Sequence, residues 1–200
     1  MARPDRAVTA AVKIRLTEIF LSLQGEASRV GLPTVFVRLT GCPLRCGYCD
    51  TAYAFHGGET VALDAILDRV RAFGVPRVTV TGGEPLAQKG CLDLLVALCD
   101  SDWDTSLETS GALDVATVDQ RVSKIVDLKT PGSGEVDRNL WSNLMHLTPR
   151  DEVKFVVCDR PDYEWARATI TERSLADLCP VLLSPSFGQI DPRSLAEWIL

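Results

Sequence analysis

Six short runs of apolar or β-branched residues recur along the 200-residue chain, and this recurrence limits the folds that it can adopt. Runs such as Val35-Phe36-Val37 and Phe155-Val156-Val157 are apolar at consecutive positions. Such runs are typical of strands that are covered on both faces of a parallel sheet. The pattern predicts strands at residues 34–40, 77–81, 105–108, 124–129, 152–157 and 181–184.

Between these strands, apolar residues recur at the three- and four-residue spacing of a helix face. The order strand, helix, strand therefore repeats, which predicts an α/β fold with a parallel sheet and right-handed crossovers. Six units are fewer than the eight of a closed barrel, so we expect an open, partial (β/α)6 barrel whose strand carboxyl ends face the site. The predicted helix faces are Leu63, Ile66, Leu67 and Val70 before Gly74, and Leu92, Leu95, Val96 and Cys99.

Length and charge narrow the class of protein. Two hundred residues fit one globular core, so we expect a single domain over residues 1–200, with a flexible stretch at residues 1–10 and a loop at residues 131–134. A net charge of −6 offers no positive field to nucleic acid or anionic lipid, and we expect neither as a partner. Arg3, Asp5 and Arg6 precede no apolar leader, so we expect a soluble, cytoplasmic protein.

Three of the seven cysteines fall within eight residues, after the first predicted strand. Cys42, Cys46 and Cys49 have the spacing C-x3-C-x2-C, and the neighbouring Gly41 and Pro43 allow a tight loop. Three thiolates satisfy three irons of a cubane cluster and leave the fourth iron open to a small-molecule ligand. The other cysteines lie in apolar contexts and are expected to pack as small core residues; they are Cys91, Cys99, Cys158 and Cys179.

Two other readings of the cysteine loop stay open at this point. The loop could hold zinc with His56 as a fourth ligand, or its cysteines could be ordinary core residues. Zinc sites favour a fourth protein ligand and paired C-x2-C knuckles, and the chain has only one such knuckle. The loop therefore favours an iron–sulfur cluster over zinc.

The cysteine spacing, with Tyr48 directly before the last cysteine, resembles that of the radical S-adenosylmethionine superfamily. The resemblance implies a [4Fe–4S] cluster on Cys42, Cys46 and Cys49, and reductive cleavage of S-adenosylmethionine. Other motifs at predicted strand ends resemble the same superfamily. They are Thr81-Gly82-Gly83-Glu84-Pro85, whose glycines allow the backbone to approach the methionyl amine closely, Glu108-Thr109-Ser110-Gly111 near the ribose, and Lys129 near the methionyl carboxylate or the substrate.

Within that superfamily, the chain resembles the 7-carboxy-7-deazaguanine synthases from about residue 17 to residue 186. The motifs that carry the resemblance are Leu23-Gln24-Gly25-Glu26, Cys49-Asp50-Thr51 and Arg38. The resemblance implies a lyase that converts 6-carboxy-5,6,7,8-tetrahydropterin to 7-carboxy-7-deazaguanine with loss of ammonia, in 7-deazapurine (queuosine) biosynthesis. It also implies an electron donor such as flavodoxin, and a homodimer.

The resemblance assigns roles to particular residues. Thr51 would hold Mg²⁺, an ion that takes oxygen ligands and keeps several waters. Five residues would contact the substrate: Leu23, Gln24, Gly25, Arg38 and Thr81. Apart from the resemblance, Glu26 could accept hydrogen bonds from the aminopyrimidine edge of the pterin or be a plain loop carboxylate. Seven would contact S-adenosylmethionine: Tyr48, Cys49, Asp50, Gly83, Glu108, Ser110 and Lys129.

The chain departs from the family pattern in two places. Ala27 stands where the family has glycine after Gln-Gly-Glu, and no Gln-x-His-Lys strand follows before Leu200. We therefore expect the family's C-terminal strand to be missing, so that further sequence or another element would close the substrate pocket. The alternatives to the lyase are an enzyme that activates a glycyl radical on a partner protein, which would need neither Gln24 nor Thr51, and a zinc-stabilised binding module.

Overall fold

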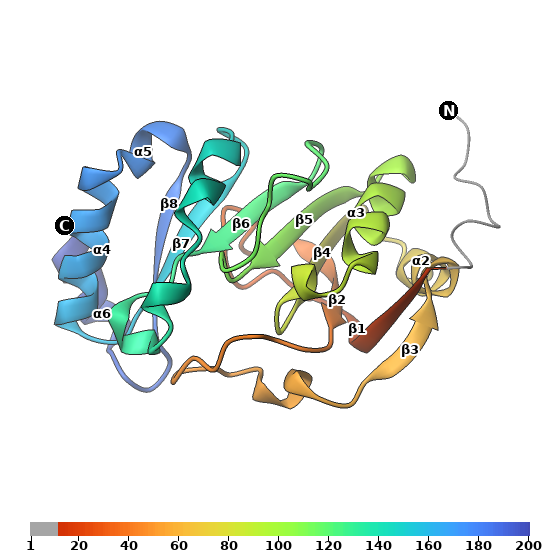
Figure 1. Ribbon diagram of the computed structural model, residues 1–200, viewed down its shortest axis with the longest axis horizontal. Coiled ribbons are helices and arrows are strands. Elements are labelled where there is room, and N and C mark those ends of the chain that lie inside the picture. Colours follow the sequence, from red (N-terminus) through yellow and green to blue (C-terminus); the bar gives the residue numbers. More distant parts are fainter. Residues whose placement is uncertain (1–11) are drawn as a thin grey trace. The chain divides into compact units, whose positions relative to one another are not determined.

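The computed structural model describes residues 12–200, which divide into two compact units. The first unit comprises residues 12–43, Thr51–Thr109 and Ala116–Ser123, and the second comprises Leu44–Asp50, Ser110–Val115 and Lys124–Leu200. Both are shown in Figure 1. The predicted flexible stretch at residues 1–10 lies outside the described residues, and the single domain stays a prediction.

The first unit has the strand order β3-β1-β2-β4-β5. β1 runs antiparallel to both of its neighbours, whereas β2, β4 and β5 run parallel to one another. The parallel strands confirm three of the six predicted ones, within about two residues at either end. The strands are β1 (Lys13–Leu23), β2 (Pro33–Leu39), β3 (Glu59–Ala62), β4 (Arg77–Gly82) and β5 (Asp104–Thr109).

Sequence analysis missed β1, an 11-residue strand. Leu23, the last residue of β1, precedes the first of the predicted strands. The first half of β1 alternates buried Ile14 and Leu16 with exposed residues, a half-buried pattern unlike the consecutive apolar residues of β2. β1 and β2 form an antiparallel hairpin in which Phe20 stacks on Phe36, with ring centroids 5.1 Å apart.

Two α-helices belong to the first unit, α2 (Leu63–Arg71) and α3 (Gly90–Asp100). The buried face of α2 is the predicted one. For α3 the helix is confirmed, and the predicted face is right for Leu95 and Cys99 but wrong for Val96, which is 39% exposed. α3 is apolar around most of its circumference, so spacing alone could not select the side that packs. Its buried residues are Cys91, Leu94, Leu95, Ala97, Leu98 and Cys99.

The second unit has three parallel strands in the order β6-β7-β8. Figure 1 shows the helices beside them, and α4 packs on β7 while α6 packs on β8. A core of buried residues that includes Val126, Val153 and Phe155 lies between the strands and the helices. The elements are β6 (Ser123–Asp127), β7 (Glu152–Val157), β8 (Val181–Pro185), α4 (Arg160–Glu172), α5 (Leu175–Leu178) and α6 (Pro192–Ile199).

Strand and α-helix do not alternate throughout the described residues. The connection from β5 to β6 consists of turns, and the connection from β6 to β7 contains 3₁₀ helices in place of an α-helix. Pro131, Gly132 and Gly134 disfavour an α-helix after β6. The 3₁₀ helices are η3 (Pro131–Ser133), η4 (Val136–Arg138) and η5 (Trp141–His146), with η1 (Ala52–Phe55) and η2 (Pro85–Ala87) in the first unit.

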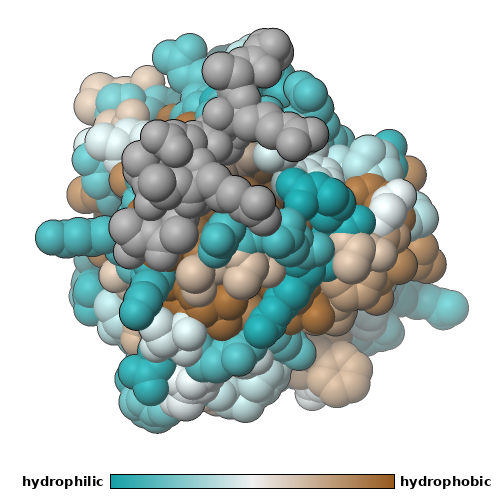
Figure 2. Space-filling model, turned by 90° about the vertical axis from the view of Figure 1, so that its right-hand side faces the viewer, coloured by the Kyte–Doolittle hydropathy of each residue, from teal (hydrophilic) through white to brown (hydrophobic). Residues whose placement is uncertain are grey.

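Figure 2 shows the face of the molecule at the α2 and β3 end of the first unit, where hydrophilic and hydrophobic side chains lie side by side. Charges of opposite sign pair there, as in the ion pairs of Arg69 with Glu59 and of Arg71 with Asp68. Within residues 12–200, every helix falls short of the length and apolar character that a membrane span requires.

Candidate functional site

The cluster loop, residues 42–49, follows β2 as predicted. Cys42, Cys46 and Cys49 form no disulfide and are all partly buried. Gly41, directly before the loop, has a φ of +100°, a conformation that glycine adopts without strain. Its backbone N–H donates to the carbonyl of Ala54, 2.8 Å away, which ties the start of the loop to η1.

The second-unit part of the cluster loop is held by the turn at residues 131–135. The backbone N–H of Gly47 donates to the carbonyl of Ser133 at 2.9 Å, and that of Arg45 donates to Glu135 Oε1 at 2.5 Å. Ser133 Oγ in turn donates to the carbonyl of Thr130 at 2.6 Å. The region predicted only as a loop therefore orders the backbone on both sides of Cys46.

Gly83 lies against the first cysteine of the cluster loop. A Cβ at this position would lie 2.5 Å from the carbonyl oxygen of Gly41 and 2.7 Å from Cys42 Cβ. Both distances are shorter than van der Waals contact, so only glycine fits without displacing Cys42. The motif at the end of β4 is thus required by packing within the first unit as well as by the expected cofactor contact.

We expect Gly83→Ala to lower the iron and sulfide content of reconstituted protein, because the added methyl must push Cys42 aside; overpacking of this kind costs about 1–3 kcal/mol. Iron and sulfide analysis with a thermal melt measures the effect. Gly47→Ala is the matched control within the loop, since its Cβ would meet Gly132 O at an ordinary 3.9 Å. Equal cluster content in both variants would contradict the packing argument.

Glu84 in the same motif is fully buried. Its carboxylate accepts hydrogen bonds from Thr109 Oγ1 at 2.9 Å and from the backbone N–H of Leu86 at 3.0 Å. It therefore joins the end of β4 to the end of β5. Sequence analysis had given this glutamate no role of its own.

Three predicted site residues of the first unit form one hydrogen-bonded group. Gln24 is only 4% exposed, and its Nε2 donates to Glu108 Oε1 at 3.1 Å. Thr81 Oγ1 donates to the other carboxylate oxygen of Glu108 at 2.9 Å. Glu108, predicted to contact the ribose, thus lies beside two residues predicted to contact the substrate.

The rest of the Leu23-Gln24-Gly25-Glu26 motif is on the surface of the hairpin. Leu23 is 62% exposed, and Gly25 and Glu26 are exposed as well. The backbone N–H of Glu26 donates to Gln24 Oε1 at 3.3 Å. The motif therefore sends one side chain inward and leaves its other members accessible.

Arg38, on β2, forms an ion pair with Glu18 of β1. Its Nε lies 2.7 Å from Glu18 Oε1, and the hydroxyl of Tyr53 donates to the same oxygen at 2.7 Å. The guanidinium also lies over the rings of Phe20 and Tyr53, 5.8 and 5.9 Å from their centroids. Burial acts to raise the pKa of Glu18, but the hydrogen bonds from Tyr53 and Arg38 and the charge of Arg38 outweigh it and lower that pKa below its ordinary value.

Thr51 directly precedes η1 and is partly buried, while its neighbour Asp50 is exposed. The carbonyl of Thr51 accepts a hydrogen bond from the backbone N–H of Ala54 at 2.9 Å. Its hydroxyl makes no capping hydrogen bond to the turn. Thr51 and Tyr53 therefore sit on the same short turn of the first unit.

Lys129 lies in a buried polar group of the second unit. Its ammonium is 3.1 Å from Asp127 Oδ2, which also lies 3.5 Å from that of Lys154, and it lies 5.6 Å from the centroid of the Tyr48 ring. The Tyr48 hydroxyl and Asp127 Oδ1 are buried with no hydrogen-bond partner among the described residues. Burial and the charge of Asp127 raise the pKa of Tyr48 well above its ordinary value.

Two buried asparagines that sequence analysis missed hold the backbone at predicted cofactor contacts. Asn139 accepts from Lys129 N at 2.8 Å and donates to Lys129 O at 2.9 Å. Asn143 donates to Gly111 O at 3.1 Å, next to the buried Ser110. No periodicity marks either residue, because each acts through contacts distant in sequence.

The other cysteines confirm their prediction in part. Cys91, Cys99 and Cys179 are buried, whereas Cys158 is only partly buried. Burial, followed by a hydrogen bond with Asp162, raises the pKa of the Cys158 thiol to about 11.

The donor chemistry of the cluster loop fits an iron–sulfur cluster. Residues 12–200 contain no group of three or more His, Cys, Asp or Glu side chains gathered as a metal site. Cys42 belongs to the first unit, and Cys46 and Cys49 belong to the second. All three thiols are outside disulfides and retain some exposure. Three thiol donors without a fourth suit a cubane with one open iron better than they suit zinc.

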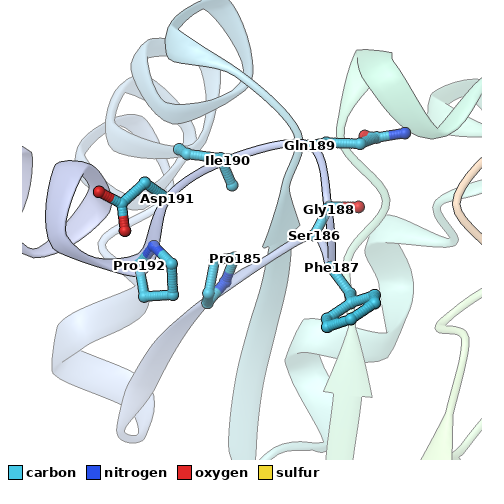
Figure 3. Close-up of a pocket in the computed structure, with 8 residues that line it drawn as sticks. All are labelled: Pro185, Ser186, Phe187, Gly188, Gln189, Ile190, Asp191 and Pro192. Atoms are coloured by element: carbon cyan, nitrogen blue, oxygen red, sulfur yellow. The ribbon is translucent and has the colours of Figure 1, made fainter.

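A cavity of about 450 Å³ lies in the loop between β8 and α6 (Figure 3). It is lined by residues 185–192, none of which sequence analysis had singled out. Phe187, in this loop, is fully exposed. None of the residues that line this cavity belongs to the polar group around Lys129.

The comparisons with known proteins agree with this architecture. Residues 36–171 match the family model of the radical SAM superfamily. The crystal structure of QueE from Escherichia coli has a similar fold, with a TM-score of 0.75 and 23% sequence identity over 98% of this chain and 94% of that chain. Fold and cysteine loop together define a radical S-adenosylmethionine enzyme and confirm the predicted fold class.

Curated relatives specify the family. The chain is 46% identical to a 7-carboxy-7-deazaguanine synthase from Chlorobaculum tepidum, over 94% of this chain and 86% of the relative. It is 42% identical to one from Koribacter versatilis, over 94% of this chain and 89% of the relative. The chain belongs to the 7-carboxy-7-deazaguanine synthase family.

Proposed function

We propose that this protein is a lyase that converts 6-carboxy-5,6,7,8-tetrahydropterin to 7-carboxy-7-deazaguanine with loss of ammonia, in 7-deazapurine (queuosine) biosynthesis. The observation that carries the proposal is 46% identity with a 7-carboxy-7-deazaguanine synthase over 94% of the chain. The three cysteines of the cluster loop, which form no disulfide, supply the chemistry that such an enzyme needs. Neither the glycyl-radical activator nor the zinc module is favoured by the relatives.

Cys42, Cys46 and Cys49 would hold a [4Fe–4S] cluster, which supplies the electron that cleaves S-adenosylmethionine and so starts the radical reaction. Gly83 allows the end of β4 to approach Cys42 closely. Tyr48, Asp50, Ser110 and Lys129 are proposed contacts for S-adenosylmethionine. The Asn139 side chain hydrogen-bonds both the N–H and the carbonyl of Lys129. These two bonds support the role of Lys129, because they fix the main chain from which its side chain extends.

On the substrate side, Arg38 would pair with the carboxylate, and Gln24 and Glu26 would face the aminopyrimidine edge. Thr81, with Glu108 beside it, would be a further contact. The carboxylate of Glu108 accepts hydrogen bonds from Gln24 Nε2 and from Thr81 Oγ1. Its bonds to Gln24 and Thr81 support placing it with the substrate. Leu23, Gly25 and Glu26 would complete that side from the hairpin.

Thr51 is the proposed protein ligand of Mg²⁺, which would also meet the substrate carboxylate. We expect Mg²⁺ to stimulate turnover, and Thr51→Ala to raise the Mg²⁺ concentration for half-maximal rate by roughly tenfold or more while cluster content stays unchanged. Titration of Mg²⁺ after treatment with chelator measures this. Thr60→Ala on β3 is a matched control. Rates indifferent to Mg²⁺ and chelator in the wild-type protein would rule out this role.

The function is tested by incubating the reconstituted protein with S-adenosylmethionine, a reductant and 6-carboxytetrahydropterin. We expect 7-carboxy-7-deazaguanine and one equivalent of ammonia. Cleavage of S-adenosylmethionine without that product would overturn the proposal and favour the glycyl-radical activator.

We also propose a cytoplasmic homodimer that receives electrons from a donor such as flavodoxin. Light scattering tests the dimer, and reduction by purified flavodoxin tests the donor.

A further inference from the structure

Within residues 12–200, only one of the three guanidinium nitrogens of Arg38, Nε, is bonded to another side chain. Its Nε donates to Glu18, and its guanidinium lies over Phe20 and Tyr53. Its two terminal nitrogens make no hydrogen bond or ion pair with the described residues. The side chain is only 16% exposed. A mostly buried arginine with two uncommitted donors offers the planar fork that binds a carboxylate through two parallel hydrogen bonds.

We propose that Glu18 and Tyr53 are positioning residues that hold Arg38 by its Nε, so that its two terminal nitrogens are available to the carboxylate of the substrate. This inference rests on the proposed function and deepens it, since it assigns carboxylate recognition to a three-residue unit. A long, flexible side chain loses entropy when it is ordered by a ligand. An arginine already fixed by Glu18 and two aromatic rings pays most of that cost on folding, which leaves more affinity for the substrate.

The charge balance of the group supports the same role. Glu18 and Arg38 sum to zero charge, so the pair can stay partly buried without a ligand. The two terminal nitrogens still carry part of the cationic charge, because the guanidinium charge is delocalised over three nitrogens. A substrate carboxylate would therefore find a directed donor pair without displacing Glu18.

Tyr53 connects this group to the proposed Mg²⁺ ligand. Its hydroxyl donates to Glu18, and it lies within η1, the turn that Thr51 precedes. η1 is also tied to Gly41 through the carbonyl of Ala54. Loss of the Tyr53 hydroxyl would loosen both Arg38 and the turn that follows Thr51. Tyr53→Phe should thus weaken substrate binding and the Mg²⁺ response together, whereas Glu18→Gln should affect mainly substrate binding.

The decisive experiment is a double-mutant cycle on reconstituted enzyme with S-adenosylmethionine and Mg²⁺, using the fluorescent analogue 6-carboxypterin as the binding probe and pterin without the carboxylate as its comparison. We expect Glu18→Ala to weaken 6-carboxypterin binding roughly tenfold and to leave pterin binding nearly unchanged. In an Arg38→Ala background, Glu18→Ala should have no further effect, because Glu18 acts through Arg38. An equal effect of Glu18→Ala in both backgrounds would overturn the inference.

Two further variants control for folding and for charge. Glu18→Gln keeps an acceptor for Arg38 Nε and should restore part of the affinity, with KM raised more than kcat is lowered. Glu59→Gln removes the carboxylate of another arginine pair, on β3, and should bind like the wild type. If the wild type makes no 7-carboxy-7-deazaguanine, the proposed function fails. If it makes the product but binds 6-carboxypterin equally well with and without Glu18, only this inference fails.

Discussion

Cys46→Ala should abolish reductive cleavage of S-adenosylmethionine. The cluster loop supplies three thiolates and no fourth ligand, so the loss of one leaves two protein ligands for a cubane that needs three. Iron and sulfide content and the visible absorbance of the cluster should fall with the activity. The measurement is 5′-deoxyadenosine formation by anaerobically reconstituted protein, quantified by chromatography.

Cys158→Ala is the matched control, because Cys158 is also partly buried and lies outside the cluster loop. It should retain both the cluster and the activity. Unchanged cleavage in Cys46→Ala would remove the basis for the three-thiolate assignment. A colourless protein that binds one equivalent of zinc would instead support the zinc module.

The second large effect concerns the substrate carboxylate. We expect tetrahydropterin without its carboxylate to be converted with a kcat/KM lower by roughly a thousandfold or more, because a site built on polar pairing is left with unpaired, desolvated groups. Arg38 and the Mg²⁺ proposed at Thr51 are those groups. Arg38→Ala should lower kcat/KM for the carboxylated substrate and shrink the ratio between the two substrates. Product analysis for both substrates with both proteins measures the ratio.

Arg69→Ala provides the comparison, since Arg69 forms an exposed ion pair with Glu59 and exposed pairs contribute little. It should keep the wild-type ratio. Equal turnover of the two substrates by the wild type would contradict carboxylate recognition and would bring the glycyl-radical activator forward.

The fold could be predicted where burial leaves a simple pattern. The six runs of apolar or β-branched residues mark β2, β4, β5, β6, β7 and β8, because the strands of a covered parallel sheet are rich in such residues. β1 was not predicted because the alternation of buried and exposed residues around Ile14 and Leu16 does not continue into its second half. There the pairing with β2 determines the strand. The face of α3 escaped for the opposite reason: nearly all of it is apolar, so the spacing carried no direction.

The residues that carry reactive chemistry could be recognised in the sequence alone. Cys42, Cys46 and Cys49 stand close together on one loop, and the spacing of three thiolates along a short chain already limits what they can ligate. The motif Thr81-Gly82-Gly83-Glu84-Pro85 likewise marks Gly83 as a site residue. Sequence therefore determined the class of chemistry and the family.

The residues that hold the reactive ones were decided only by the tertiary structure. Glu18 meets Arg38 across the β1–β2 pairing, Glu84 meets Thr109 across β4 and β5, and Asn139 clamps Lys129 from a turn. Each contact depends on strand register or on a side-chain hydrogen bond between positions that no periodicity relates. A hydrogen bond requires two groups within about 3 Å in a defined direction, and only the folded chain brings such groups together.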